Sequence, residues 1–201
     1  MNIFRIENKY KIELNKLDEL YKFLNDNNAE VLFPKRFIKS IYFDNNSYSS
    51  YFNSLEGIVP RKKIRLRSYL NLENFNQNNI FNLEYKINSV EGRYKTTHYK
   101  TNFINLFKNG ILDNFYGFIS PVTEVTYFRE YYKLFNLRIT VDLKIKYKKF
   151  EKNKFNLSHD EAIVEVKSNN LSNLNYIDEK ICFMKTRFSK YCNALETLNI
   201  I

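Results

Sequence analysis

The sequence contains no tryptophan, two cysteines, two histidines, four glycines and three prolines among its 201 residues. Such low glycine and proline contents exclude a collagen-like chain and a linker-rich architecture. The spacing of Cys182, Cys192, His98 and His159 does not fit a zinc site, so we expect reduced thiols and histidines without a chemical role. No apolar run reaches the roughly 20 residues of a transmembrane helix, and the start of the chain lacks a signal peptide. These absences predict a cytoplasmic protein that forms one domain over residues 1–201.

Positive charge and aromatic residues are abundant. Lys and Arg number 32 against 22 Asp and Glu, which gives a formal net charge of +10, and the chain has 16 Tyr and 18 Phe. Hydrophobic residues make up 44% of the sequence, which is typical of a chain that folds around a core. The charge predicts an anionic partner, but composition alone does not separate nucleic acid, a membrane surface and a small polyanion.

Period-two alternation of apolar and polar residues recurs along the chain, as in half-buried β-strands. Eight segments show it: residues 2–14, 40–45, 61–70, 80–87, 92–100, 122–132, 136–147 and 161–167. Three segments have helical spacing instead: residues 15–28, with Asn15 as a candidate N-cap, residues 101–110, closed by Gly110, and residues 188–199. Residues 74–79 and 150–160 are predicted loops. The pattern predicts an α+β fold, an eight-stranded antiparallel β-barrel with flanking helices.

One predicted strand, RKKIRLRSY (residues 61–69), carries Arg61, Lys63, Arg65 and Arg67 on a single face. Two unit charges 4 Å apart interact by about 4 kcal/mol at an effective dielectric of 20, so such a face requires a partner. In a closed barrel with its polar faces inward, the partner would lie on the axis, and lysines of an empty bore would tend to lose protons. Because the planar fork of arginine suits phosphate, the pattern favours a phosphate chain.

Single carboxylates interrupt the cationic faces at Glu7, Glu84, Asp142 and Glu165. Carboxylates in this setting could hold a divalent cation such as Mg²⁺ or Mn²⁺, which bridges phosphate oxygens. Asp142 fits better as a salt-bridge partner for Arg138 or another cation. For any single strand, a charged face exposed to solvent is the simpler alternative.

Eight short motifs, taken in order, resemble the VTC domain, the polyphosphate polymerase module of vacuolar transporter chaperone complexes. They are FRIENKY, IYFDN, RKKIRLRSY, LEYK, TYFREYY, LRITVD, IVEVK and RFSKY, and they extend from Phe4 to Tyr191. That family belongs to the triphosphate tunnel metalloenzymes, which are related to CYTH triphosphatases. The resemblance implies an eight-stranded tunnel that binds a nucleoside triphosphate and a metal ion.

Carried over by motif, the resemblance implies a set of residues that bind phosphate: Lys9, Arg65, Arg67, Lys86, Tyr127, Arg129, Arg138, Lys167, Ser189 and Lys190. Among them, the residues that would stabilise the transferring group are Arg65, Arg67, Arg129, Arg138 and Lys190. Glu165 would ligate the metal, with Glu7 or Glu84 as candidate further ligands. Tyr127 could instead be a packing aromatic, and Arg61 and Lys63 could lie beyond the tunnel mouth.

Many tunnel triphosphatases begin with a Glu-x-Glu-x-Lys pattern, whereas this chain reads RIENK over residues 5–9, with Arg5 at the first acidic position. The difference favours phosphate-chain binding over hydrolysis. The predicted function is therefore transfer of the γ-phosphoryl group of ATP to phosphate or a growing polyphosphate chain. A metal-dependent triphosphatase and a non-catalytic polyphosphate-binding module are the alternatives. Inward-facing cations argue against a nucleic-acid partner, and we expect any coupling to a membrane to require another protein.

Overall fold

A computed structural model of the chain describes residues 6–71, 81–98, 104–152, 156–157, 161–168, 171–181 and 183–201. Several sequence predictions fall on positions outside these ranges: Arg5, residues 99–103, the loop at 74–79, parts of the loop at 150–160, His159 and Cys182.

Eleven strands make up the described sheet. They are β1 (Ile6–Glu13), β2 (Glu30–Asp44), β3 (Arg61–Asn71), β4 (Asn82–Ser89), β5 (Gly92–His98), β6 (Ile111–Asp113), β7 (Gly117–Leu134), β8 (Leu137–Lys149), β9 (Asn156–Leu157), β10 (Glu161–Ser168) and β11 (Met184–Lys185). The hydrogen-bonded order is β11-β1-β10-β8-β7-β2-β3-β4-β5, with β6 paired to β7 and β9 to β8. Every pairing is antiparallel. All eight strands predicted from alternation are present, and the α+β antiparallel fold is confirmed.

Five helices accompany the sheet: α1 (Leu17–Asp26), α2 (Ser49–Leu55), α3 (Ile104–Asn109), α4 (Leu171–Lys180) and α5 (Lys190–Thr197). The three predicted helices correspond to α1, α3 and α5. The predicted N-cap Asn15 is wrong, because a 3₁₀ turn over Leu14–Lys16 precedes α1 and places Lys16 at the cap position. Gly110 does follow α3, with φ +63 and its N–H bonded to the carbonyl of Leu106 at 3.1 Å.

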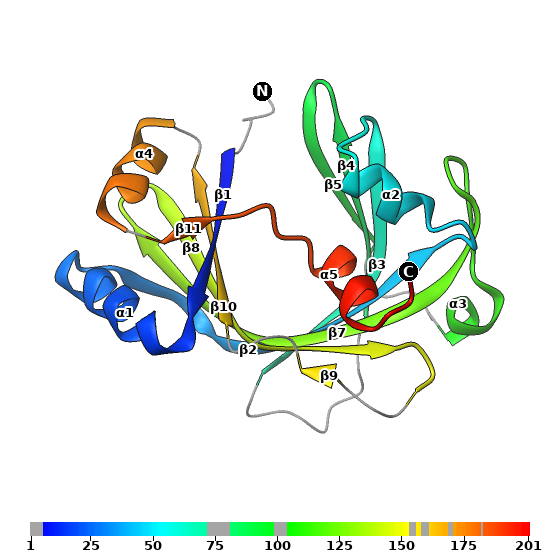
Figure 1. Ribbon diagram of the computed structural model, residues 1–201, viewed down its shortest axis with the longest axis horizontal. Helices are drawn as coiled ribbons and strands as arrows, with labels where there is room; N and C mark the ends of the chain where they lie inside the picture. Colours follow the sequence, from blue (N-terminus) through cyan, green and yellow to red (C-terminus); the bar gives the residue numbers. More distant parts are fainter. Residues whose placement is uncertain are drawn as a thin grey trace.

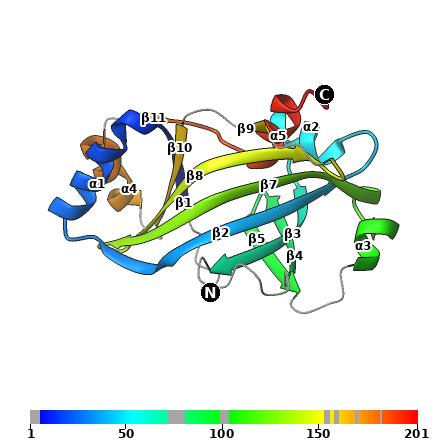
Figure 2. The ribbon, with the colours of Figure 1, turned by 90° about the horizontal axis from the view of Figure 1, so that it is seen from below.

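The sheet bends into a U (Figure 1). Strands β1 and β10 form one arm, the long strands β8, β7 and β2 form the base, and β3, β4 and β5 form the other arm; Figure 2 shows the base strands side by side. The predicted closed barrel differs from this arrangement, since no backbone pairing joins β1 to β5 within the described residues. Charged side chains meet across the gap instead, for example Arg93 of β5 and Glu7 of β1 at 3.8 Å.

Apolar side chains cover the outside of both arms. Leu20 and Leu24 of α1 and Leu174 and Ile177 of α4 pack over one arm with residues such as Val164, and a second cluster lies behind β3 and β4. This arrangement agrees with the prediction that the apolar faces lie under helices, with the polar faces inside.

Helix α5 lies inside the U (Figure 1) and fills one end of the concave face. Tyr191, Cys192 and Leu195 are buried there against Ile38 and Val125, and Cys192 is a free thiol. We call this the α5 end. The opposite end, where β2 and β8 begin and β7 and β10 end, is called the Tyr131 end. The polar part of the concave face lies between them.

Every helix in the described ranges is too short to span a bilayer.

Candidate functional site

Strands β3 and β4 supply one half of the site. Arg65 donates from Nε and Nη2 to Glu84 Oε2, at 2.8 and 2.7 Å, and from Nη1 to the Tyr42 hydroxyl at 3.1 Å. Arg67 is 5% exposed and donates to Ser40 Oγ and to the Tyr127 hydroxyl, both at 3.0 Å. Because side chains two residues apart on a strand share a face, the RLR motif places both guanidinium groups on the concave side.

The base strands supply a second group of charged side chains around Asp142, which is 0% exposed. Arg129 donates from Nε to Oδ1 at 2.6 Å and from Nη2 to Oδ2 at 2.7 Å, and Lys190 of α5 also pairs with Oδ2. Both cations lie over the Tyr127 ring, at 5.3 and 4.6 Å from its centroid. The structure therefore brings together Arg129, Lys190 and Tyr127, and Asp142 takes the predicted salt-bridge role with Arg129 as its partner.

The segment between β11 and α5 crosses from one arm of the U toward the other (Figure 1). Lys9 of β1 donates to the carbonyl of Phe188 at 2.8 Å, and Lys63 of β3 donates to Ser189 Oγ at 2.8 Å. Ser189 is also the N-cap of α5, accepting from the N–H of Cys192 at 3.4 Å. Lys63 thus belongs to the concave face, while Arg61 bonds the carbonyls of Gly57 and Ile58 in an exposed turn.

A network of ion pairs connects the side chains of β1 and β10. Glu7 faces Lys167 and Lys9 faces Glu165 in the register of the two strands. Lys167 contacts Glu165 at 2.5 Å and Glu7 at 3.6 Å, and Lys9 contacts Glu7 at 3.2 Å. Burial and the neighbouring Glu165 oppose ionisation of Glu7, but Lys86, Lys9 and Lys167 outweigh them and lower its pKa. Burial also opposes ionisation of Glu165, and Lys167, Arg129 and Lys9 hold its pKa well below the usual range.

The pair Glu7 and Glu165 has the donor chemistry of a divalent-cation site, because Mg²⁺ commonly takes one or two carboxylates together with substrate phosphates. Glu84 does not join them: no group of three or more potential metal ligands occurs in the described part of the chain. Its carboxylate is instead occupied by Arg65 and by Lys95 at 2.6 Å. Burial opposes its ionisation, but these cations and Arg67 lower the pKa of Glu84 to about 2.

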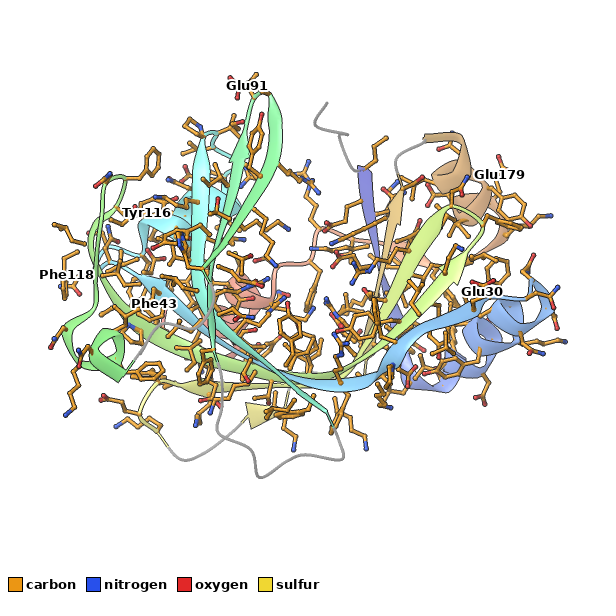
Figure 3. The ribbon with its side chains drawn as sticks, turned by 180° about the vertical axis from the view of Figure 1, so that it is seen from behind. Glu30, Phe43, Glu91, Tyr116, Phe118 and Glu179 are labelled. Atoms are coloured by element: carbon orange, nitrogen blue, oxygen red, sulfur yellow. The ribbon has the colours of Figure 1, made fainter. Side chains whose placement is uncertain are left out.

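Cations outnumber carboxylates on this face; Figure 3 shows side chains that project into the space between the two arms. The cations are Lys9, Lys63, Arg65, Arg67, Lys86, Arg129, Lys167 and Lys190, and the carboxylates are Glu7, Glu84, Asp142 and Glu165. Burial lowers the pKa of Lys86 to about 7, with Lys9 adding to the shift and Glu7 opposing it. Burial also lowers the pKa of Lys63 and of Lys190. These three lysines thus give up protons more readily than free lysine, in agreement with the sequence prediction for lysines on such a face.

Arg138 lies at the edge of this cluster, opposite Lys167 in the register of β8 and β10. It is exposed, at the Tyr131 end, with its guanidinium 5.7 Å from the centroid of the Tyr131 ring. It lies four residues before Asp142 on the same face of β8, and Asp142 pairs with Arg129 instead.

Sequence analysis missed Tyr42, Lys95, Arg36 and Arg93. Burial opposes ionisation of Tyr42, but Arg65 and Arg67 lower its pKa to about 8. Tyr42, Arg93 and Lys95 lie within segments predicted as strands, so their position in the alternation could have assigned them to the polar face. Arg36 lies in the part of β2 before the predicted strand.

The model of the VTC domain family matches residues 4–199. A search of curated proteins found no match.

Solved structures share the fold at low identity. A protein of Vibrio parahaemolyticus, provisionally described as an adenylate cyclase, matches with a TM-score of 0.56 and 13% identity over 96% of this chain and 98% of its own. HpAC1 from Hippeastrum, provisionally an adenylyl cyclase and described as having a dominant triphosphatase activity, matches with a TM-score of 0.54 and 12% identity over 96% of each chain. A chain of the Schizosaccharomyces pombe Mediator head module matches with a TM-score of 0.56 and 9% identity, over 87% of this chain and 92% of its own. At these identities the likeness concerns the fold.

Proposed function

The chain belongs to the VTC domain family, and on that premise we propose that it is a polyphosphate polymerase. It transfers the γ-phosphoryl group of ATP to phosphate or to the end of a growing polyphosphate chain. The bond between the γ-phosphorus and the oxygen that bridges it to the β-phosphorus breaks, and ADP leaves with that oxygen. A terminal phosphate oxygen of the acceptor forms the new bond, so the chain lengthens by one phosphate.

One observation carries this proposal: cations from both arms, the base and α5 meet on a single concave face and outnumber the carboxylates there. Donor and acceptor are both polyanions, so their approach requires surrounding positive charge. Phosphoryl transfer depends on alignment and charge stabilisation more than on a protein nucleophile. A face of this composition suits that requirement.

The arginines of the cluster have defined roles in the proposal. Arg65 and Arg129 are each oriented by a buried carboxylate, Glu84 and Asp142 respectively, and retain further N–H groups for phosphate oxygens. With Arg67, Arg138 and Lys190 they would stabilise the transferring group. The other phosphate-binding residues of the proposal are Lys9, Lys86, Tyr127, Lys167 and Ser189.

Glu165 and Glu7 would hold a divalent cation, Mg²⁺ or Mn²⁺. When bound, such an ion would neutralise charge that develops on the phosphate oxygens. Lys167 contacts both carboxylates, at 2.5 and 3.6 Å, and would compete with the cation for them until phosphate draws the lysine away.

A triphosphatase is the second candidate, with water as the acceptor in place of the phosphate chain. HpAC1, which is described as having a dominant triphosphatase activity, shares the fold, and this supports a triphosphatase as the alternative function. A non-catalytic polyphosphate-binding module is the third candidate. The fold shared with a Mediator chain is compatible with a role in an assembly.

Incubation of the full chain with ATP and Mn²⁺, followed by gel separation of polymer and assay of free phosphate, distinguishes the three. The polymerase makes polymer and ADP, and a metal-free sample makes neither. Free phosphate without polymer would replace the proposal with a triphosphatase. Intact ATP combined with tight binding of tripolyphosphate would replace it with a binding module. Competition of tripolyphosphate against DNA tests the expectation that nucleic acid is not the partner.

A further inference from the structure

A serine and a lysine from different arms of the fold meet where α5 begins. The Nζ atom of Lys63, on β3, lies 2.8 Å from Oγ of Ser189. Within the described residues, this contact is the only hydrogen bond or ion pair that the Lys63 side chain makes. The distance is in the range over which a general base takes a proton from a hydroxyl group. A hydroxyl held by an otherwise unpaired amine is the arrangement of a nucleophile with its base.

The hydroxyl of Ser189 is held by the lysine more closely than by the helix that it caps. A serine at an N-cap ordinarily accepts a hydrogen bond from the backbone of the first turn. Here that bond, from the N–H of Cys192, is 3.4 Å long, beyond the usual range, whereas the contact with Lys63 is within it. No acceptor for the hydroxyl proton of Ser189 is found in the described part of the chain. A neutral Lys63 amine would be that acceptor.

The surroundings of Lys63 favour the neutral amine. Lys63 stands opposite Lys86 in the register of β3 and β4, and like charges in this position oppose each other. Arg61 and Arg65 are two residues away on the same face of β3. Burial lowers the pKa of Lys63. The neutral form that a general base requires is therefore more accessible here than in a lysine exposed to solvent.

The residues on either side of Ser189 connect its hydroxyl to the proposed phosphate site. The carbonyl of Phe188 accepts from Lys9 at 2.8 Å, and the side chain of Lys190 pairs with Asp142. Ser189 itself is half-buried, so a ligand on the concave face can reach it. A triphosphate held by these cations would bring its terminal phosphorus close to the hydroxyl. The phosphoserine formed there would have lysine amines around it, and these favour its negative charge.

We propose that Ser189 is a self-phosphorylation site, at which the chain transfers the γ-phosphoryl group of ATP to its own hydroxyl with Lys63 as the general base. Neutral Lys63 takes the proton from Oγ, and the bond between Oγ and the γ-phosphorus forms. The bond from that phosphorus to the bridging oxygen breaks, and ADP leaves with this oxygen. Lys63 is then an ammonium group beside phosphoserine. The inference rests on the proposed function, because it uses the same bound ATP, and it adds a covalent modification to the site.

Incubation of the full chain with Mn²⁺ and ATP radiolabelled at the γ-phosphate tests the inference, with peptide mass spectrometry to locate the label. The wild-type chain should carry a single phosphate on Ser189. The label should survive acid, as a phosphate ester of serine does and the phosphoramidate of a lysine does not. Ser189→Ala should carry no label, and Ser189→Thr, which keeps a hydroxyl and a capping oxygen, should be labelled.

Two substitutions of Lys63 separate a base from a positive charge. Lys63→Gln and Lys63→Arg should each slow labelling about 100-fold or more, as expected for loss of a general base. Arginine keeps the charge and a hydrogen-bond donor, but it does not release its proton. Labelling of Lys63→Arg at the wild-type rate would therefore overturn the role of Lys63 as the base.

The rate of labelling should also rise with pH, because only the neutral amine accepts the proton. Burial lowers the pKa of Lys63, Lys9 and Arg61 add to the shift, and Cys192 and Tyr42 oppose it. The residual labelling of Lys63→Arg should lack this rise, and the ionisation of ATP is the same for both proteins. Parallel pH profiles for the two proteins would contradict the base.

Ser49→Ala is the matched control. Ser49 is the first residue of α2, and its hydroxyl accepts from the side-chain amide of Asn45 at 2.9 Å, with no lysine in contact among the described residues. This variant should be labelled on Ser189 to the same extent as the wild-type chain. The melting temperature of each variant verifies that it is folded.

Polymer assayed in the same samples separates this inference from the proposed function. Polymer without phosphoserine would overturn only the self-phosphorylation, as would a label that acid removes or that lies on a residue other than Ser189. Phosphoserine at Ser189 without polymer would support the self-phosphorylation and overturn the polymerase. Absence of both products would overturn both proposals.

Discussion

Arg129 and Asp142 face each other across β7 and β8 and share two hydrogen bonds, of 2.6 and 2.7 Å, in a fork. Burial opposes ionisation of Asp142, but Arg129 and Lys190 lower its pKa, so one carboxylate compensates two cations in the middle of the concave face. The pair both fixes the guanidinium plane and limits the net positive charge of the face. Removal of the carboxylate should therefore affect stability and anion binding in opposite directions.

We expect Asp142→Asn to lower the free energy of unfolding by about 3–5 kcal/mol, the usual cost of leaving a buried charge without its partner. The same change should increase the rise in melting temperature that tripolyphosphate produces, because phosphate then supplies the missing negative charge. Thermal unfolding with and without tripolyphosphate measures both effects.

Asp113→Asn is the control for this prediction. Asp113 pairs with Lys62, whose ammonium lies near Tyr85 on the outer side of β3 and β4. Its loss should lower stability without enlarging the effect of tripolyphosphate. A similar enlargement in both variants would mean that Asp142 acts only through general stability.

Glu165→Gln should abolish most turnover, by about 100-fold or more, because the proposed cation loses a charged ligand worth several kcal/mol in the transition state. Metal-free binding of tripolyphosphate should be kept or strengthened, since the variant removes a negative charge from the face. Assays of ATP consumption and of tripolyphosphate binding separate the two effects.

Glu161→Gln changes an acidic residue on the same strand that pairs with Lys11 at 2.8 Å. It should leave turnover unchanged. Full activity in Glu165→Gln would contradict the metal role of that carboxylate.

Alternation in the sequence was enough to predict the eight main strands but not the ends of β2. The predicted strand at 40–45 is longer in the structure, where β2 runs over Glu30–Asp44. The earlier part of β2 was missed because its period-two pattern is disturbed by Pro34 and by register shifts near Val31, Phe33 and Arg36. Helix α2 was missed because it has seven residues and its N-cap residue, Tyr48 at φ +51, makes no side-chain capping hydrogen bond. The short strands β6, β9 and β11 have two or three residues, too few to show a period.

Which face a site residue occupies was predictable, but its partner was not. The alternation of RKKIRLRSY places Arg65 and Arg67 on the concave face, and their distance from the rest of the site depends on strand order. Asp142 meets Arg129 because a register shift lies between Thr126 and Phe128 of β7. No local pattern in the sequence specifies such a shift, so Arg129 could not be identified as the partner from the sequence. Arg138, which the sequence analysis named, lies four residues away on the same strand, a spacing of roughly 13 Å.

Lys86 should make anion binding depend on pH. Burial lowers its pKa to about 7, and a bound polyanion should raise this pKa because the ligand favours the charged lysine. The affinity for tripolyphosphate should therefore fall as the pH rises above 7, by up to about tenfold per pH unit. The pKa values of the neighbouring Glu7 and Glu165 are lowered, so both carboxylates stay ionised over this range.

Lys86→Arg provides the comparison, because arginine remains charged at every pH in the series. The ligand's own ionisation is the same for both proteins, so the difference between their pH profiles isolates Lys86. Identical profiles from pH 6 to 9 would show that Lys86 is charged throughout or does not meet the ligand.

Tyr191→Phe should affect stability and spare the site. The Tyr191 hydroxyl donates to Asp44 Oδ2 at 2.6 Å, at a carboxylate that is 1% exposed and also accepts backbone N–H groups of α2. The free energy of unfolding should fall by about 1.5–3 kcal/mol, as for loss of one hydrogen bond to a buried charged group. Phenylalanine keeps the ring that stacks on Tyr42 at 5.3 Å, so tripolyphosphate binding should be unchanged.

The control for Tyr191 is Tyr51→Phe, which removes a hydroxyl bonded to Glu196 at 3.2 Å in the same apolar cluster. Because Glu196 is more exposed than Asp44, this variant should cost less than about 1 kcal/mol. Denaturant unfolding and tripolyphosphate titration of both variants complete the comparison. Weaker tripolyphosphate binding in Tyr191→Phe at unchanged stability would place its hydroxyl in contact with the ligand. That outcome would extend the phosphate-binding surface to the α5 end. In the structure the Tyr191 hydroxyl is hydrogen-bonded to Asp44 there.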